Sequence, residues 1–205
     1  MSVIHLCFFY INKECANLTA IVNAVMQVTA GVAGIWSFET AVTFTCEAGY
    51  YLSPNLPIIC SSNGSWNDPQ RVCERVTCIP PITPNNGSYY PEKSTYNYSE
   101  MVEFVCQLGF DLIGLNSSEC IDKDQWSEGP PLCQLKDCGI LTDPPNGKVW
   151  HTDSTTVGAT AYYNCSEGST LNGTTSRTCN ESGVWTSESP TCDVIRKCII
   201  DSLFR

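Results

Sequence analysis

The chain has 205 residues, 14 of them cysteine, with 42% apolar residues and a formal net charge of −10. Its length would allow one or two ordinary domains. This many cysteines instead predicts several small disulfide-linked domains, because small units bury too little apolar surface to be stable unaided. Structural zinc sites usually contain C-x2-C pairs; the chain has none, and its only histidines are His5 and His151, so no metal is expected. Disulfides predict an extracellular chain, either secreted or the ectodomain of a membrane protein.

The first 14 residues, MSVIHLCFFYINKE, are left unassigned. They contain an apolar run, but it has no basic start and is followed by Lys13-Glu14, which is not the pattern of a secretory signal peptide. How the chain is targeted for secretion is therefore not predicted. No cofactor-binding motif is recognised in this segment or elsewhere in the chain.

An internal repeat covers most of the remaining chain. In three places, two cysteines are 14 residues apart, a tryptophan follows after six residues, and another cysteine follows seven residues later. A further cysteine opens each copy. Because three copies of one spacing are very unlikely to arise by chance, the repeat predicts three tandem units joined by four-residue linkers. The units are residues 15–73, 78–133 and 138–192, called modules 1, 2 and 3 below.

The repeat resembles the complement control protein module, also called the sushi domain or short consensus repeat. The resemblance rests on the four cysteines, a late tryptophan, a proline before the last cysteine and a glycine three residues after the second cysteine. These residues are Trp66, Trp126 and Trp185, then Pro69, Pro131 and Pro190, then Gly49, Gly109 and Gly168. The resemblance implies an all-β fold of small disulfide-stapled sushi modules in an elongated tandem array.

Four cysteines allow three pairings, and the sequence alone does not choose among them. The resemblance implies first-to-third and second-to-fourth pairs. These would be Cys15–Cys60, Cys46–Cys73, Cys78–Cys120, Cys106–Cys133, Cys138–Cys179 and Cys165–Cys192. Apolar residues alternate with polar ones before Cys46 and Cys106, and more weakly before Cys165, which is the period of a β-strand. The late tryptophans follow the cysteines so regularly that a core position is expected rather than a ligand contact.

Module 1 departs from the pattern by extra residues in Met26–Phe38. The stretch Cys15–Phe38 carries no charge and is long enough to span a bilayer as a helix. Polar residues interrupt it, however, and both Cys15 and Asn23 lie in the register of the repeat. We therefore predict a module here; the membrane span is kept as the minority alternative, under which Cys60 would be unpaired.

Eight N-x-[ST] sequons agree with an extracellular glycoprotein. The glycosylation candidates are Asn17, Asn63, Asn86, Asn97, Asn116, Asn172 and Asn180. The eighth sequon, Asn164-Cys165-Ser166, is expected to be used least, because its middle residue would form a disulfide. The sequon at Asn63 has no counterpart in the other modules, and a glycan there would keep that edge of module 1 from being a contact surface.

No group of residues predicts catalysis. His151 is the only histidine inside a module, it has no free cysteine beside it, and neither a calcium loop nor a glycine-rich phosphate loop is present. The acidic triplet Asp122-Lys123-Asp124 occupies a turn filled by Asn-Gly in module 1, which predicts a solvated turn. The chain is therefore interpreted as non-enzymatic, with no catalytic, cofactor or metal site.

Charge favours a protein partner. Module 2 has eight acidic and two basic residues, and all three modules are net acidic. Nucleic acid and heparin-like polyanions are therefore disfavoured, and a partner with a basic face is compatible. The expected contact is the segment Ser88–Tyr98, because interfaces favour tyrosine; the candidates are Tyr89, Tyr90 and Tyr96. Alternatively, these rings pack on the module, or a glycan at Asn97 shields them.

The resemblance implies an extracellular protein-binding array of the complement-regulator or adhesion-receptor type. The alternatives are a structural spacer, or a non-catalytic fragment of a larger modular protein such as a complement-type serine protease. The tail 193–205 contains Cys198, which favours the start of a truncated fourth module. For Cys7 the end of a preceding module, an interchain bridge and a free thiol remain open.

Overall fold

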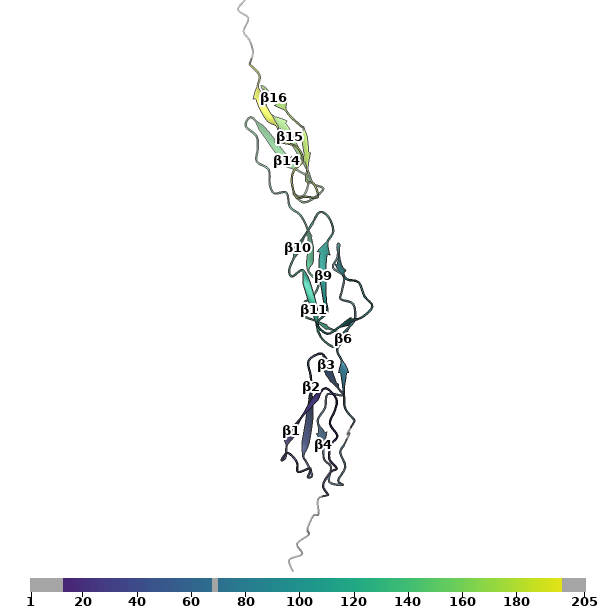
Figure 1. The fold of residues 1–205 in the computed structure, drawn as a ribbon. Coiled ribbons are helices and arrows are strands. Elements are labelled where there is room, and N and C mark those ends of the chain that lie inside the picture. The colour runs from purple at the N-terminus through teal and green to yellow at the C-terminus, as the bar shows by residue number, and fades with distance from the viewer. Residues whose placement is uncertain (1–12, 68–69, 197–205) are drawn as a thin grey trace, which may run out of the picture. The chain divides into compact units, whose positions relative to one another are not determined.

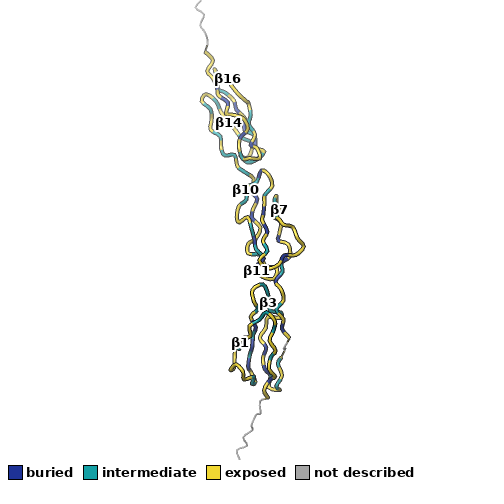
Figure 2. The backbone as a smooth tube through the Cα atoms, viewed as in Figure 1, coloured by how far each residue is buried: buried dark blue, intermediate teal, exposed yellow. Residues whose placement is uncertain are grey.

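The structure is a computed structural model that describes residues 13–67 and 70–196. These residues form 18 short strands and no helix (Figure 1). The predicted all-β fold is therefore confirmed. Cys7, Pro69 and Cys198 lie outside the described residues. Buried residues occur in short stretches within each module, and most of the residues coloured in Figure 2 are exposed or half-buried. Each module is described by itself below.

Module 1 is built on a three-stranded sheet with the order β1-β2-β4, and β3 pairs separately with β5. Its strands are β1 Ala24–Ala30, β2 Ala41–Cys46, β3 Tyr50–Ser53, β4 Ile58–Ile59 and β5 Val72–Arg75. The alternation predicted before Cys46 is present, because Val42 and Phe44 are buried and the residues between them are more exposed. Ile58 completes this core, and Trp36 and Trp66 pack against it.

The stretch Cys15–Phe38 forms coil, strand β1 and a loop rather than a helix. Across the described ranges, no helix has the length and apolar character that crossing a bilayer requires. The extra residues of module 1 bring Trp36 edge-on to Trp66, with ring centroids 5.8 Å apart. The Trp36 indole N–H also donates a 2.7 Å hydrogen bond to Asn17 Oδ1. The insertion therefore adds an aromatic ring to the core of module 1.

Module 2 contains a four-stranded sheet with the order β12-β11-β9-β7, and two strand pairs, β6–β8 and β10–β13. Its strands are β6 Thr77–Cys78, β7 Gly87–Tyr90, β8 Tyr96–Asn97, β9 Met101–Cys106, β10 Phe110–Ile113, β11 Ser117–Asp122, β12 Gln125–Trp126 and β13 Leu132–Leu135. Val102 and Phe104 alternate into the core as predicted. Ser118 is the buried polar residue of this sheet, and its hydroxyl donates to the Glu128 carbonyl.

Module 3 repeats this plan with a sheet of order β14-β15-β17 and the pair β16–β18. Its strands are β14 Gly147–His151, β15 Thr160–Cys165, β16 Ser169–Asn172, β17 Ser176–Thr178 and β18 Thr191–Val194. Ala159, Ala161, Tyr163 and Trp185 form its buried cluster together with Cys179. The weaker alternation before Cys165 therefore also marks a strand with one buried face.

Six disulfides join the strands, two in each module. The pairs are Cys15–Cys60, Cys46–Cys73, Cys78–Cys120, Cys106–Cys133, Cys138–Cys179 and Cys165–Cys192. They close loops of 41 to 45 residues and of 27 residues. In the chain-entropy model, each such loop stabilises the folded state by about 4 kcal/mol. A scaffold of this kind can carry large sequence changes on its surface without unfolding.

Candidate binding surface

The late tryptophan is a structural residue in all three modules. Each indole N–H donates a hydrogen bond to the carbonyl of the residue that follows the first cysteine. The pairs are Trp66 with Ala16 at 2.7 Å, Trp126 with Ile79 at 3.0 Å, and Trp185 with Gly139 at 2.9 Å. Each indole thereby pairs its N–H donor and ties itself to the start of the module. Trp185 is buried, and Trp66 and Trp126 are half-buried, which agrees with the expected core position.

The acidic triplet of module 2 forms the turn between β11 and β12. Asp124 has a φ of 53°, in the left-handed region, where Gly64 and Gly183 have 82° and 77° in the other modules. Asp is one of the few residues with a side chain that adopts this conformation readily. Lys123 and both aspartates are exposed. This is the solvated turn that the sequence predicts.

His151 has a structural environment. Its ring lies tilted against Trp185 with centroids 5.6 Å apart, and its Nε2 accepts a 3.3 Å hydrogen bond from the Leu141 N–H. His151 is half-buried because it alternates with the exposed Trp150 on strand β14. In the described ranges, no three His, Cys, Asp or Glu residues are grouped so that they could hold a metal ion.

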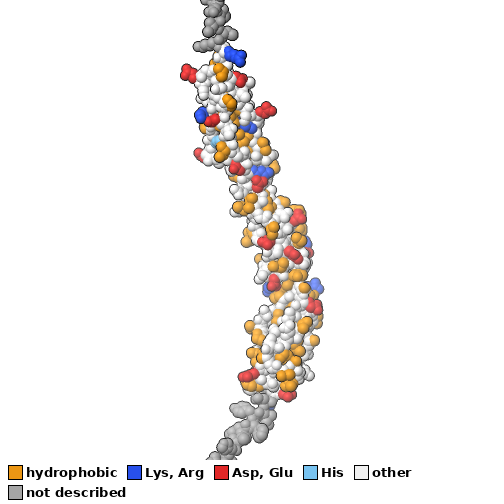
Figure 3. Space-filling view, turned by 90° about the vertical axis from the view of Figure 1, so that its left-hand side faces the viewer, with side chains coloured by type: hydrophobic (Ala, Val, Ile, Leu, Met, Phe, Trp, Pro, Cys, Tyr) orange, Lys and Arg blue, Asp and Glu red, His pale blue; other side chains and the backbone are white. Residues whose placement is uncertain are grey.

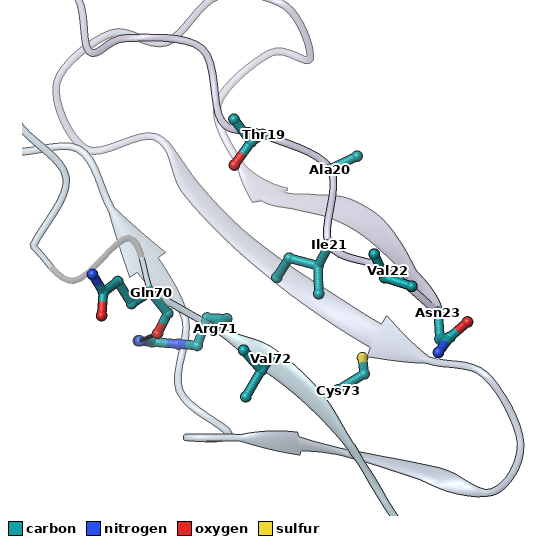
Figure 4. Close-up of a pocket in the computed structure, with 9 residues that line it drawn as sticks. All are labelled: Thr19, Ala20, Ile21, Val22, Asn23, Gln70, Arg71, Val72 and Cys73. Carbon is teal, nitrogen blue, oxygen red and sulfur yellow. Dashed lines mark hydrogen bonds between the residues drawn. The ribbon is translucent and has the colours of Figure 1, made fainter.

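A groove of about 550 Å³ runs along module 1 between residues 19–23 and residues 70–73. In Figure 4, Ile21 points toward the segment that carries Arg71 and Val72. The Arg71 guanidinium is turned to backbone carbonyls, those of Leu56 at 3.2 Å and Gln70 at 2.9 Å. The lining residues include no carboxylate, histidine or free thiol. The groove therefore lacks the groups needed for acid–base or nucleophilic chemistry.

The three candidate tyrosines of module 2 lie in different environments. Tyr96 was expected at a contact surface but is fully buried, because its ring packs edge-on against Trp126 with centroids 5.0 Å apart. Tyr89 is half-buried and packs edge-on against Phe104 at 6.2 Å. Tyr90 is 51% exposed. Of the three, only Tyr90 presents a large part of its ring to solvent.

Tyr90 lies opposite Glu103 across strands β7 and β9. Its hydroxyl donates a hydrogen bond to Glu103 Oε2. This bond raises the pKa of the Tyr90 hydroxyl, followed in size by desolvation and by the negative charge of Glu103. The pair therefore presents a half-exposed aromatic ring beside a carboxylate.

Module 2 carries eight acidic and two basic residues. Lys93 is tied to Glu100 by a 3.1 Å ion pair. The Asn97 backbone N–H lowers the pKa of Glu100, and the Lys93 hydrogen bond lowers it further. Glu92 and Glu103 are exposed. On the face seen in Figure 3, Lys and Arg side chains lie singly rather than in a patch. Acidic side chains therefore outnumber basic ones on module 2, which gives it a negative electrostatic potential.

The register of the sheets reveals that Tyr90 has an equivalent in each of the other modules. Tyr90, Trp150 and Gln27 each lie 12 residues after the first cysteine of their module. Their cross-strand partners are Glu103, Tyr162 and Thr43, respectively. The equal spacing from the first cysteine is the signal in the sequence that relates these three positions. Trp150 is 50% exposed and stacks on Tyr162, with centroids 5.9 Å apart and 23° between the rings.

Comparison with known proteins identifies the scaffold. A family model described as Sushi repeat (SCR repeat) matches residues 15–73, 78–133 and 138–192. The chain belongs to the sushi repeat family. Family membership and the six disulfides place the chain outside the cell, as a secreted protein or an ectodomain. The resemblance found in the cysteine and tryptophan spacing is confirmed.

Several relatives contain similar sushi arrays within longer chains. E-selectin of Equus caballus is 30% identical over 190 residues, which is 89% of this chain and 31% of that protein. Membrane cofactor protein of Sus scrofa is 30% identical over 195 residues, 88% of this chain and 52% of that protein. A third relative is the Mus musculus protein called Sushi, von Willebrand factor type A, EGF and pentraxin domain-containing protein 1. It is 35% identical over 161 residues, which is 78% of this chain and 4% of that protein. The chain thus spans about half or less of these relatives.

Proposed function

We propose that this chain is a non-enzymatic, extracellular array of sushi modules that binds a protein with a basic face. The observation that carries the proposal is the Tyr90–Glu103 pair, an exposed aromatic ring beside a carboxylate on the most acidic module. Tyrosine is enriched among residues that dominate binding energy. Negative charge around it would steer a basic partner and make the association rate depend on salt.

The disposition of side chains supports binding over catalysis. The exposed aromatic and acidic groups of module 2 lie on strands that disulfides hold rigid, whereas the groove of module 1 has no reactive group. Sushi arrays also occur in a selectin and in a membrane cofactor protein, which agrees with the adhesion-receptor and complement-regulator types. We assign the contact to Tyr90 and not to the buried Tyr96.

A structural spacer is the second candidate, and one observation favours it. All eight sequon asparagines are exposed in the structure, so glycans could cover much of every module. A chain covered in this way would hold a neighbouring domain at a distance without binding anything itself. The two functions differ in whether the isolated chain attaches to cell surfaces.

The experiment measures binding of the soluble three-module chain to cultured cells. We expect saturable binding that weakens at least tenfold between 50 and 300 mM salt, about the size expected when several charge pairs contribute. Protease treatment of the cells should abolish binding, and heparinase treatment should leave it unchanged. Binding that resists protease but is lost after heparinase would contradict a protein partner, and no binding at all would favour the spacer.

A pair of variants locates the contact. Tyr90→Ala should weaken binding about tenfold or more, the range of an interface residue that contributes strongly. Ile113→Ala is the matched control, because Ile113 is 52% exposed on strand β10 of the same module. If the two variants bind cells equally well, Tyr90 is not part of the contact surface.

A further inference from the structure

Module 3 has an exposed aromatic pair that the proposed function does not use. Trp150 on β14 and Tyr162 on β15 lie directly opposite each other and stack, yet they are 50% and 41% exposed. Exposing two large stacked rings to water is unfavourable in free energy, because covering them would remove considerable apolar surface from water. The neighbouring residues show what can cover them.

Asn164 lies on the same face of the sheet as the aromatic pair. It follows Tyr162 by two residues on β15, and its cross-strand partner is Lys148, two residues before Trp150. Side chains at i and i+2 point to the same face about 7 Å apart, and diagonal neighbours across strands lie about 7–8 Å apart. Asn164 is exposed, whereas Tyr163, which lies between Tyr162 and Asn164, is buried on the other face of the strand, as is Ala161.

Asn164 is also the first residue of the sequon Asn164-Cys165-Ser166. Its amide is accessible, and no side-chain hydrogen bond engages it within the described residues. By contrast, Asn172 Nδ2 in the same module donates to Asp193 Oδ2 at 3.1 Å. The Lys148 ammonium is held 2.7 Å from Asp143 Oδ2. The Lys148 ammonium opposite Asn164 is therefore already paired with a carboxylate.

We propose that Asn164 carries an N-linked glycan whose first sugar packs over the Trp150–Tyr162 pair. In the attachment step, Asn164 Nδ2 forms a bond to C1 of the N-acetylglucosamine at the reducing end of a lipid diphosphate-linked oligosaccharide. The C1–O bond to the lipid diphosphate breaks, the lipid diphosphate leaves, and Nδ2 loses one proton. The donor is the activated oligosaccharide of the secretory pathway, which a sequon requires.

The chemistry of the sugar suits the aromatic pair. One face of a pyranose ring presents C–H groups with partial positive charge, and the face of an aromatic ring carries negative charge. A sugar linked to Asn164 starts from a residue about 7–8 Å from both ring-bearing positions, so little freedom is lost when it settles there. The glycan would thus cover the apolar pair and keep module 3 out of the binding surface.

The disulfide of Cys165 does not oppose this modification. Its partner Cys192 lies 27 residues further along the chain. Since synthesis proceeds from the N-terminus, the sequon is complete before Cys192 has been added. The expectation that this sequon is used least rested on the folded state, in which Cys165 is already bonded.

The first measurement is site-localised mass spectrometry of glycopeptides from the chain secreted by mammalian cells. We expect a glycan on Asn164 in most molecules, and its loss in Ser166→Ala, which removes the sequon but keeps Asn164. Thr174→Ala, which removes the Asn172 sequon of the same module, is the matched control and should leave Asn164 occupied. An unmodified Asn164 in the secreted wild-type chain would overturn the proposal.

The second measurement is the NMR spectrum of the glycosylated chain. Ring currents of the stacked pair should shift protons of the first sugar on Asn164 upfield by several tenths of a ppm, and Trp150→Ser should remove that shift. Tyr162→Ser provides a second variant should Trp150→Ser fold poorly. A glycan on Asn164 whose proton shifts are unaffected by either change would refute the packing. A drop in cell binding with Trp150→Ser, together with an unmodified Asn164, would assign the pair to a protein contact instead.

Discussion

Modules 2 and 3 present different chemistry at one equivalent strand position. In module 2, Tyr90 bonds to the carboxylate of Glu103, and in module 3, Trp150 stacks on Tyr162. The disulfides and the indole-to-carbonyl bond of the late tryptophan are the same in both modules. The shared residues therefore hold the fold, whereas the exposed cross-strand pair varies and distinguishes the surfaces of the two modules.

Module 1 extends the comparison with a third version of the same position. There Gln27 faces Thr43, so neither an aromatic ring nor a charge is present. Module 1 differs in its core as well, because Trp36 joins Trp66 where the other modules use a tyrosine or a histidine beside the tryptophan. The three modules therefore vary both their exposed pairs and the packing around one constant ring.

The largest expected effect comes from removing that constant ring in module 3. Trp185→Ala should lower the free energy of unfolding of module 3 by about 3–5 kcal/mol, because a buried indole and its hydrogen bond to Gly139 are lost. Trp150→Ala, which deletes an exposed indole in the same module, should cost no more than about 1.5 kcal/mol. Denaturant titrations followed by NMR signals of module 3 measure both. Equal costs would contradict the division into core and exposed aromatic residues.

A smaller effect is expected at the glycine that opens strand β14. A Cβ on Gly147 would lie 2.5 Å from Cys192 Sγ and 3.0 Å from the Asn164 carbonyl oxygen. Gly147→Ala should therefore destabilise module 3 by about 1–3 kcal/mol through overpacking.

Module 1 supplies the natural contrast, because it has Ala24 at this position and Ile21 in place of Pro144. Ala24→Gly should change its free energy of unfolding by no more than about 1 kcal/mol. Thermal unfolding of both variants compares these two changes in stability. An unchanged unfolding midpoint for Gly147→Ala would contradict the overpacking, because it would mean that Cys192 moves aside without cost to make room for the new Cβ.

The smallest effect is a pH dependence confined to module 2. The pKa of Glu100 is lowered by the Asn97 N–H and by Lys93. A lowered pKa in the folded state means that the stabilisation is present above the ordinary glutamate pKa of about 4.3 and is lost as the pH falls through the lower folded pKa. Glu100→Gln should flatten this part of the stability curve, measured between pH 5 and pH 2. An NMR titration in which Glu100 titrates at or above the ordinary value would contradict the assignment.

Much of the fold could be predicted from the sequence, because the features that determine it are local in spacing. Cysteines at constant intervals mark the modules, and alternation before Cys46, Cys106 and Cys165 marks the buried strands. Asp124 was recognisable as a turn residue because only a few residue types adopt a left-handed φ. The disulfide pairs formed in the structure are those that the family resemblance implies.

The binding surface was harder to predict, because exposure depends on contacts between distant segments. Tyr96 lies on the two-residue strand β8, too short for an alternating pattern, and its burial depends on Trp126. The indole-to-carbonyl bonds join residues 46 to 50 positions apart, so no local pattern reveals them. Trp150 was passed over because one tryptophan in a strand does not show which face it occupies until the partner strand is known.

The most direct test replaces the exposed pair of module 2 with that of module 1. Tyr90→Gln combined with Glu103→Thr keeps the disulfides and the core but removes the ring and the charge. We expect the unfolding midpoint of module 2 to change little while binding of the chain to cells weakens at least tenfold. Unchanged binding by this variant, with module 2 folded, would show that the exposed cross-strand pair does not carry recognition.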